Sequence, residues 1–417
     1  MAEPLALLGG RPAFAQPLHV GRPNIGDRGR LMERIEGILD RNWFTNRGPV
    51  VQEFEQALAA QLQVEHVVAV CNATLGLEIV TRAAGITGEV IVPAFTFVAT
   101  AHAIQWQGLT PVFADIDRST HVIDPASVEA LVTPRTTAIV GVHTWGRPCP
   151  VDELGVIAER HGLLTFFDAA HAMGCTHRGR PIGGNGTAEV FSFHATKYVN
   201  SFEGGAIATN DATLAARVRS MVNFGFEGPD QVTSVGTNAK MSEISAAMGL
   251  TSLESEPRFA AHNRVIWEAY RAGLAGVPGL TLAGYTPKER NAHQYVVVEV
   301  GDDAPLARDE IVGMLHADGC MARRYFYPGV HRMEPYASLA PMSHLWLPNT
   351  EDLTRRVMVL PTGTAMTLES VETVCTLIAR SFDDHLAVRA AVAAGPPVAS
   401  AIGWTGPVGG ARPDEGR

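Results

Sequence analysis

The feature that most constrains the fold is an alternation of short apolar runs with longer helical patterns between residues 66 and 210. The apolar runs are rich in β-branched residues, which is typical of strands buried on both faces. Strands are expected at 66–70, 89–92, 110–114, 137–143, 163–168, 189–193 and 206–209, with helices at 74–84, 98–107 and 151–160. This order predicts an α/β domain with a mostly parallel sheet covered by helices.

The rest of the chain predicts a second, smaller lobe, because single cores stop growing at roughly 250–300 residues. Beyond a long helical stretch at 242–274, the expected elements are a strand at 294–300, a helix at 307–317, an aromatic-rich segment at 323–336 and a helix at 368–382. The predicted division is a large domain with the amino-terminal segment at 1–255, a small α+β domain at 256–388, and a disordered tail at 389–417. The tail is rich in Gly, Ala and Pro and shows no periodicity.

Composition disfavours several classes of protein. The net charge of −10 disfavours nucleic-acid binding, since phosphate backbones attract basic surfaces. The five cysteines are scattered without a metal-binding pair, so no metal site and no disulfide framework are predicted. No apolar stretch approaches the ~18 residues of a membrane span, and the amino terminus lacks a signal-peptide pattern. We therefore expect a cytoplasmic protein without a membrane partner.

Polar residues follow three of the expected strands, where ligands of parallel sheets bind. Asn72, Ala73 and Thr74 open a helix, whose free N–H groups suit a phosphate, although an ordinary helix cap has the same pattern. Asp168 ends an apolar strand, where a carboxylate needs a cationic or hydrogen-bonding partner or simply caps the next helix. These residues predict a binding site at one edge of the sheet.

Lys197 lies beyond a third strand end, in a chain that has lysine only at positions 197, 240 and 288. A single lysine is usually a surface residue, but this one lies among aromatic residues, and a desolvated lysine is a usable amine nucleophile. Phosphate donors, an acid for a pyridinium and an amine for an aldehyde are the three groups that bind pyridoxal phosphate (PLP). Phe97, where a strand gives way to a helix, suits stacking on the cofactor ring or a place in the core.

The motifs "GPVVQEFEQALA", "VPAFTFVATAHAI", "FFDAAHAMGC", "FSFHATKYVNSFEGG" and "GTNAKMSEISAAMGL" resemble those of the DegT/DnrJ/EryC1/StrS sugar aminotransferases. The resemblance runs from about residue 22 to 382. It implies the fold of aspartate aminotransferase (PLP-dependent fold type I) and a homodimer with active sites at the subunit interface. It also implies PLP as cofactor, with pyridoxamine phosphate formed between the two half-reactions.

The resemblance also implies roles for individual residues. Lys197 matches the Schiff-base lysine, and Asp168 matches the partner of the pyridine nitrogen. Phe97 matches the stacking position, and His171 falls where many members carry Gln near the cofactor hydroxyl. The phosphate positions match Ala73, Thr74 and Ser192, and Asn238 matches an asparagine supplied by the neighbouring subunit.

Within the family, the motifs are most similar to enzymes of antibiotic-sugar pathways that make dTDP-4-amino-4,6-dideoxy-D-glucose. Such enzymes take the amino group from L-glutamate and pass it to the C4 keto group of dTDP-4-keto-6-deoxy-D-glucose in a ping-pong mechanism. For the sugar nucleotide, the candidate contacts are Arg324, Tyr327 and His331, with Lys240 from the partner subunit.

Several alternatives stay open on the sequence. A 3-aminotransferase or another nucleotide-keto-sugar aminotransferase would carry the same motifs. A PLP-dependent sugar dehydratase of this fold would replace Lys197 with histidine, and a non-catalytic regulator would not need Lys197, Asp168 and Phe97 together. A nicotinamide oxidoreductase is disfavoured because "GGNG" at 183–186 does not join a strand to a helix.

Overall fold

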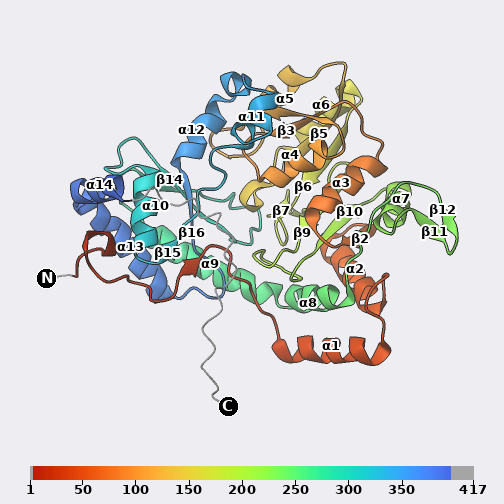
Figure 1. The fold of residues 1–417 in the computed structure, drawn as a ribbon, viewed down its shortest axis with the longest axis horizontal. Coiled ribbons are helices and arrows are strands. Elements are labelled where there is room, and N and C mark those ends of the chain that lie inside the picture. Colours follow the sequence, from red (N-terminus) through yellow and green to blue (C-terminus); the bar gives the residue numbers. More distant parts are fainter. Residues whose placement is uncertain (1–2, 396–417) are drawn as a thin grey trace, which may run out of the picture.

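The computed structural model describes residues 3–395, which form two lobes (Figure 1). The large lobe is built on a seven-stranded sheet of order β2-β10-β9-β6-β5-β3-β4. Its strands are β2 (His66–Val70), β3 (Glu89–Pro93), β4 (Thr110–Ala114), β5 (Thr136–Val142), β6 (Leu164–Asp168), β9 (Ala188–Ser192) and β10 (Gly205–Thr209). Only the pairs that β10 makes with β2 and β9 are antiparallel, so the predicted mostly parallel sheet is confirmed.

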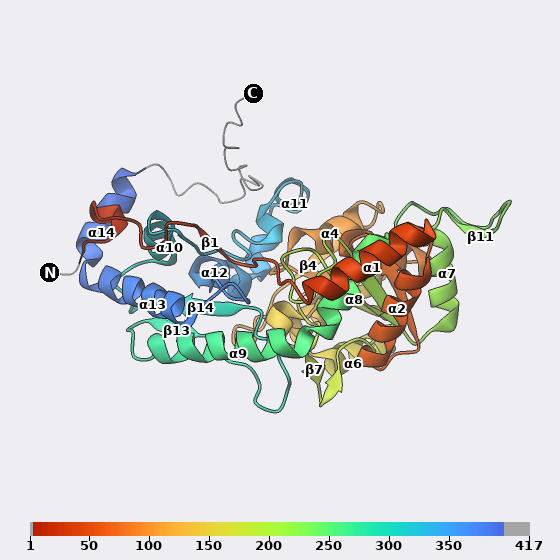
Figure 2. The same ribbon diagram turned by 90° about the horizontal axis from the view of Figure 1, so that it is seen from below.

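Helices cover both faces of this sheet because successive apolar side chains of a strand point to opposite faces. Val68 and Val70 of β2 pack with one set of helices, whereas Val67 and Ala69 pack with another. On the first face lie α3 (Ala73–Ala83), α4 (Val98–Gln105) and α7 (Ala212–Val222). The opposite face is covered by α2 (Pro49–Leu62), α8 (Glu243–Glu254), α5 (Pro125–Leu131) and α6 (Val151–His161). Helix α1 (Arg28–Arg41) packs on the outside of α8 (Figure 2).

The small lobe packs three helices against a three-stranded antiparallel sheet of order β13-β14-β16. The strands are β13 (Leu280–Leu282), β14 (Val296–Val300) and β16 (Val357–Leu360), and the helices are α9 (Glu256–Gly273), α10 (Arg308–Ala317) and α13 (Leu368–Asp383). Smaller elements are β7 (Thr176–His177), β8 (Arg180–Pro181), β11 (Phe226–Gly228), β12 (Gln231–Val232), α11 (Tyr336–Leu339) and α12 (Pro348–Arg356), with 3₁₀ turns at Ala6–Leu8, Thr144–Gly146, Val330–Arg332 and Ser343–Trp346. No described helix is both long and apolar enough to cross a membrane.

The structure corrects the expected domain limits at the amino end. Leu5 and Leu18 lie in the core of the small lobe, and β1 (Leu18–His19) pairs with β15 (Cys320–Met321). The segment 5–19 therefore packs with the small lobe, although the prediction assigned 1–255 as a whole to the large one. This pairing spans some 300 residues of sequence, and no local pattern predicts it.

Two predicted boundaries of helical regions also change. The stretch 242–274 is two helices rather than one, because α8 ends before Ser255 and Pro257 lies in the first turn of α9, where its missing N–H is tolerated. The predicted division at 388/389 falls inside α14 (His385–Ala394), where Val388 is fully buried. The remainder of the predicted tail, from residue 396, lies outside the described residues.

Candidate active site

The predicted site residues gather at one edge of the large sheet because several strands end there. Strand β6 runs parallel to β9, with Asp168 opposite Val190. Strands β9 and β2 are both antiparallel to β10, so they run in the same direction and end at the same edge. The segments that follow β2, β6 and β9 carry Thr74, Asp168 and Lys197, respectively. The sheet topology thus brings three distant parts of the sequence together, as predicted.

Lys197 lies in the loop between β9 and β10. Its backbone N–H donates to His194 O at 2.8 Å, and Gln294 Nε2 donates to the carbonyl of the preceding residue, Thr196, at 3.2 Å. The side chain is half-buried, and Nζ donates to the Tyr295 hydroxyl at 3.5 Å. Burial lowers the pKa of Lys197 to about 8, partly opposed by the negative charge of Asp168. More of this amine is therefore unprotonated and nucleophilic near neutral pH than in an ordinary exposed lysine.

Asp168 is the last residue of β6, and its side chain is buried. Each carboxylate oxygen accepts one hydrogen bond from the protein. Oδ1 accepts from the backbone N–H of Ala170 at 3.0 Å, and Oδ2 accepts from the Thr100 hydroxyl at 2.8 Å. These bonds stabilise a buried carboxylate and leave one lone pair on each oxygen for a cationic group.

The amino terminus of α3 has the geometry of a phosphate site. The Asn72 side chain accepts from Leu75 N at 2.9 Å, and among the described residues no acceptor is found for the amides of Ala73 and Thr74. Gly205 of β10 lies directly beside them: a Cβ atom there would stand 2.8 Å from Ala73 N and 2.8 Å from Phe191 O. The glycine keeps this cradle open, and free amides at a helix amino terminus bind anions. The residues present therefore fit the phosphate of the expected cofactor, with Ser192 next to Gly205 across the β9–β10 pair.

His171 lies between aromatic rings near Lys197. Its ring stacks on Trp145 and Phe326, with centroid distances of 5.9 and 6.1 Å, and its Nδ1 accepts from Trp145 N at 3.3 Å. Burial and the nearby Lys197 hold the pKa of His171 well below its usual value. The ring is therefore neutral with its proton on Nε2, and it can donate a hydrogen bond as the expected Gln would. Phe97 precedes α4 and is 57% exposed, so its ring is available for stacking.

Asn238 and Lys240 lie beside the end of β2. The backbone of Lys240 forms an isolated antiparallel β-bridge with Val70, and Cys71 N donates to Ala239 O at 2.7 Å. Lys240 Nζ donates to Asn238 Oδ1 at 2.7 Å and lies 4.6 Å from the Phe224 ring centroid. Asn238 is exposed, so its side chain is accessible from outside the chain.

The candidate contacts for a sugar nucleotide divide into two groups. Tyr327 is 41% exposed, and its ring centroid lies 4.9 Å from the guanidinium carbon of Arg324 and 5.2 Å from that of Arg308. His331, in contrast, is 1% exposed and forms a 2.6 Å hydrogen bond between Nε2 and Glu351 Oε1. The assignment of His331 as a substrate contact is therefore corrected: its ring supports the packing of the segment after α10 and β15 and is closed to solvent.

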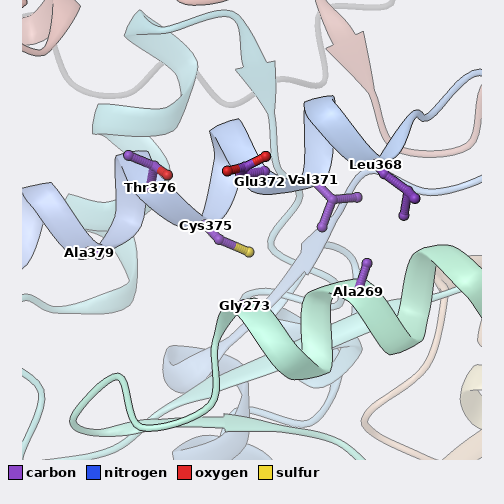
Figure 3. A pocket seen from close by; sticks show the side chains of 8 residues that line it. All are labelled: Ala269, Gly273, Leu368, Val371, Glu372, Cys375, Thr376 and Ala379. Atoms are coloured by element: carbon purple, nitrogen blue, oxygen red, sulfur yellow. The ribbon is translucent and has the colours of Figure 1, made fainter.

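A groove of about 320 Å³ lies elsewhere, between α9 and α13 of the small lobe (Figure 3). Its lining offers one carboxylate and no cationic group, so it does not suit a phosphorylated ligand. The residues that line it are Ala269, Gly273, Leu368, Val371, Glu372, Cys375, Thr376 and Ala379.

Sequence reasoning missed four residues that contact the site. Thr100 lies in the first turn of the helix expected at 98–107, next to a strand end, so its place near the site was available from the sequence, whereas Thr96 precedes that helix. Gly205 follows another glycine at the start of a strand, which is a recognised sign of close backbone approach. Tyr295 comes from the small lobe, almost 100 residues after Lys197, and no local pattern indicates its contact.

Comparisons with known proteins identify a family. The model of the DegT/DnrJ/EryC1/StrS aminotransferase family matches residues 27–379. The dTDP-4-amino-4,6-dideoxy-D-glucose transaminase of Escherichia coli is 36% identical over 362 residues, covering 86% of this chain and 97% of that protein. GDP-perosamine synthase of Caulobacter vibrioides is 38% identical over 313 residues, covering 72% of this chain and 82% of that protein.

Among solved structures, a crystal structure of DesI in the presence of its TDP-sugar product superposes with a TM-score of 0.88. It is 52% identical, and the match covers 93% of this chain and 98% of that one. The aminotransferase PseC of Helicobacter pylori, involved in the biosynthesis of pseudoaminic acid, superposes with a TM-score of 0.83 at 26% identity, covering 88% of this chain and 100% of that one. The fold of aspartate aminotransferase and the PLP cofactor are thereby confirmed. The chain belongs to the DegT/DnrJ/EryC1/StrS aminotransferase family and is a PLP-dependent sugar aminotransferase.

Proposed function

We propose that this enzyme transfers the amino group of L-glutamate to the C4 keto group of dTDP-4-keto-6-deoxy-D-glucose, giving dTDP-4-amino-4,6-dideoxy-D-glucose. The observation that carries the proposal is the similarity to the Escherichia coli transaminase, whose name states that product and 97% of whose length is matched. A solved relative with 52% identity, described with its TDP-sugar product, supports the nucleotide. The reaction belongs to deoxysugar biosynthesis, and we propose an antibiotic-sugar pathway in the cytoplasm.

The proposed residue roles follow from the contacts at the sheet edge. When bound, PLP supplies an aldehyde that combines with amines and a ring that accepts electrons from the donor carbon. Lys197 would hold the cofactor through its amine. Once free, this amine would take up and return the proton at the donor α-carbon, as a general base and then a general acid. Because the same lysine acts on the amino donor and then on the keto sugar, the two half-reactions alternate in ping-pong order.

The other residues would bind and orient. Asp168, buried and held by two hydrogen bonds, would keep the ring nitrogen protonated. The free amides of Ala73 and Thr74, with Ser192, would bind the phosphate. Phe97 would stack on the ring, and His171 would donate to its hydroxyl.

We also propose a homodimer in which Asn238 and Lys240 complete the partner's site. The hairpin of β11 and β12 projects from the large lobe (Figures 1 and 2), and it exposes Phe226, Val232 and Val235 by 39–73%. Such exposed apolar side chains near a site are typical of a protein interface. Light scattering would measure the mass, and a monomer with full activity would contradict a shared site.

A second candidate is the amination of a GDP-linked keto sugar, because GDP-perosamine synthase is 38% identical over most of its length. A panel experiment separates the two. The purified enzyme is incubated with PLP, L-glutamate and keto sugars carrying dTDP or GDP, and the new C–N bond is located by NMR. Amination at C4 of the dTDP sugar supports the proposal. Preference for a GDP sugar, or a new bond at C3, rejects it in favour of a related aminotransferase.

A further inference from the structure

Two threonine hydroxyls connect the start of α4 to the Asp168 carboxylate. Thr100 Oγ1 donates to Asp168 Oδ2 at 2.8 Å, and Thr96 Oγ1 lies 2.9 Å from Thr100 Oγ1. Both threonines are 1% exposed, and Asp168 is 7% exposed, so water does not compete for these bonds. Phe97 lies between the two threonines in sequence. One short segment therefore carries both the proposed stacking ring and the contact to the carboxylate.

The direction of this chain follows from hydrogen-bond chemistry. A carboxylate has only acceptor sites, so the Thr100 proton is directed at Asp168. The Thr100 oxygen is then free to accept, and Thr96 donates to it. Each hydroxyl polarises the next, and this strengthens the bond that reaches the charge. With Ala170 N holding the other oxygen, the carboxylate plane is fixed at both oxygens.

We propose that Thr100, aligned by Thr96, is a positioning residue that fixes the plane and the charge of the Asp168 carboxylate toward the ring nitrogen of PLP. This inference rests on the proposed role of Asp168. Without the Thr100 donor, the charged carboxylate loses one of its two protein partners and is free to rotate. The proton shared with the ring nitrogen then lies closer to Asp168, and the ring becomes a weaker electron acceptor.

The test compares two buried threonine–aspartate pairs. Thr100→Val removes the hydroxyl at nearly constant volume. Thr350→Val is the matched control, because Thr350 is fully buried and donates to Asp115 Oδ1 at 2.8 Å. Asp115 follows β4, which lies three strands from β6, outside the site. Thr100→Ser retains the hydroxyl and should restore function.

The main readout is the pH titration of the visible absorbance of the PLP-bound enzyme, with turnover measured beside it. The other titratable groups that sense the Asp168 charge are Lys197 and Tyr295, and neither is changed by these variants. Melting temperature of the cofactor-free protein reports any general loss of stability. Asp168→Asn serves as the reference for complete loss of the ring contact.

We expect Thr100→Val to shift the absorbance titration and to lower kcat by about 10- to 100-fold, as expected for a lost hydrogen bond to a charged group. Thr350→Val should lower the melting temperature and leave both the titration and kcat as in the wild type. Normal titration and kcat in Thr100→Val beside an impaired Asp168→Asn would overturn the positioning role alone. A wild-type titration in Asp168→Asn would instead reject the proposed role of Asp168 itself.

Discussion

The strand-end edge of the large lobe and the segment 323–332 of the small lobe both concentrate polar and aromatic residues, but their polar groups differ in what they contact. At the edge, Lys197 has one long hydrogen bond of 3.5 Å. In the segment, both His331 and Arg332 contact Glu351, at 2.6 and 2.7 Å. A buried side chain whose hydrogen-bonding group is already paired within its own chain, such as His331, is less available to a ligand than Lys197, so residue type alone does not identify a binding site.

The largest effect is expected at Lys197. Lys197→Ala should lower turnover by more than about 10⁴-fold, because it removes both the amine that holds the cofactor and the group that moves the proton. The variant should also lose the visible absorbance of the bound cofactor. Turnover is measured by coupling the 2-oxoglutarate formed from L-glutamate to a dehydrogenase.

Lys288→Ala is the matched control, because Lys288 is exposed and lies outside the strand-end edge. It should retain wild-type turnover and absorbance. If both lysine variants were equally active, the strand-end edge would not be the catalytic site and the proposed mechanism would be wrong.

The difference between the strand-end edge and the segment 323–332 also explains how much of the site the sequence could predict. Lys197, Asp168 and Thr74 were predictable because each follows a strand, and the ends of parallel strands meet at one edge. His331 was misassigned because its burial depends on Glu351, which lies 20 residues further along the chain in α12. Leu5 was misassigned because its contacts with the small lobe are even more distant in sequence. Local patterns predict elements and strand ends, whereas packing between distant segments decides which polar groups stay free.

A stability effect of intermediate size is expected at His331. His331→Ala should lower the free energy of unfolding by about 2–3 kcal/mol, since it empties a buried site and removes a partner of Glu351. Arg332→Ala removes an exposed partner of the same carboxylate and should cost less than about 1 kcal/mol. Denaturant unfolding measures both. An unchanged stability in His331→Ala, together with a raised KM for the sugar nucleotide, would return His331 to the substrate site.

A smaller effect on binding is expected at Arg324. Arg324→Ala should raise the KM for the sugar nucleotide about tenfold with kcat nearly unchanged, as expected when an interaction present in both the ground state and the transition state is lost. Arg323→Ala is the control within the same segment, because its guanidinium lies over the Tyr325 ring at 5.0 Å. An equal change in both variants would mean that the segment responds as a whole. No change in either would exclude it from the substrate site.

The smallest effect is a change in the titration of the Lys197 amine in the cofactor-free protein. Burial lowers its pKa to about 8, and the Asp168 charge acts in the opposite direction because it favours the ammonium form. Asp168→Asn should therefore lower the midpoint further. The chain has three lysines, so reductive methylation with ¹³C-formaldehyde gives few NMR signals, which Lys240→Arg and Lys288→Arg assign. A midpoint near 10.5 in the wild type would mean that water reaches Lys197 freely. The pKa of Lys197 would then be that of an ordinary surface lysine.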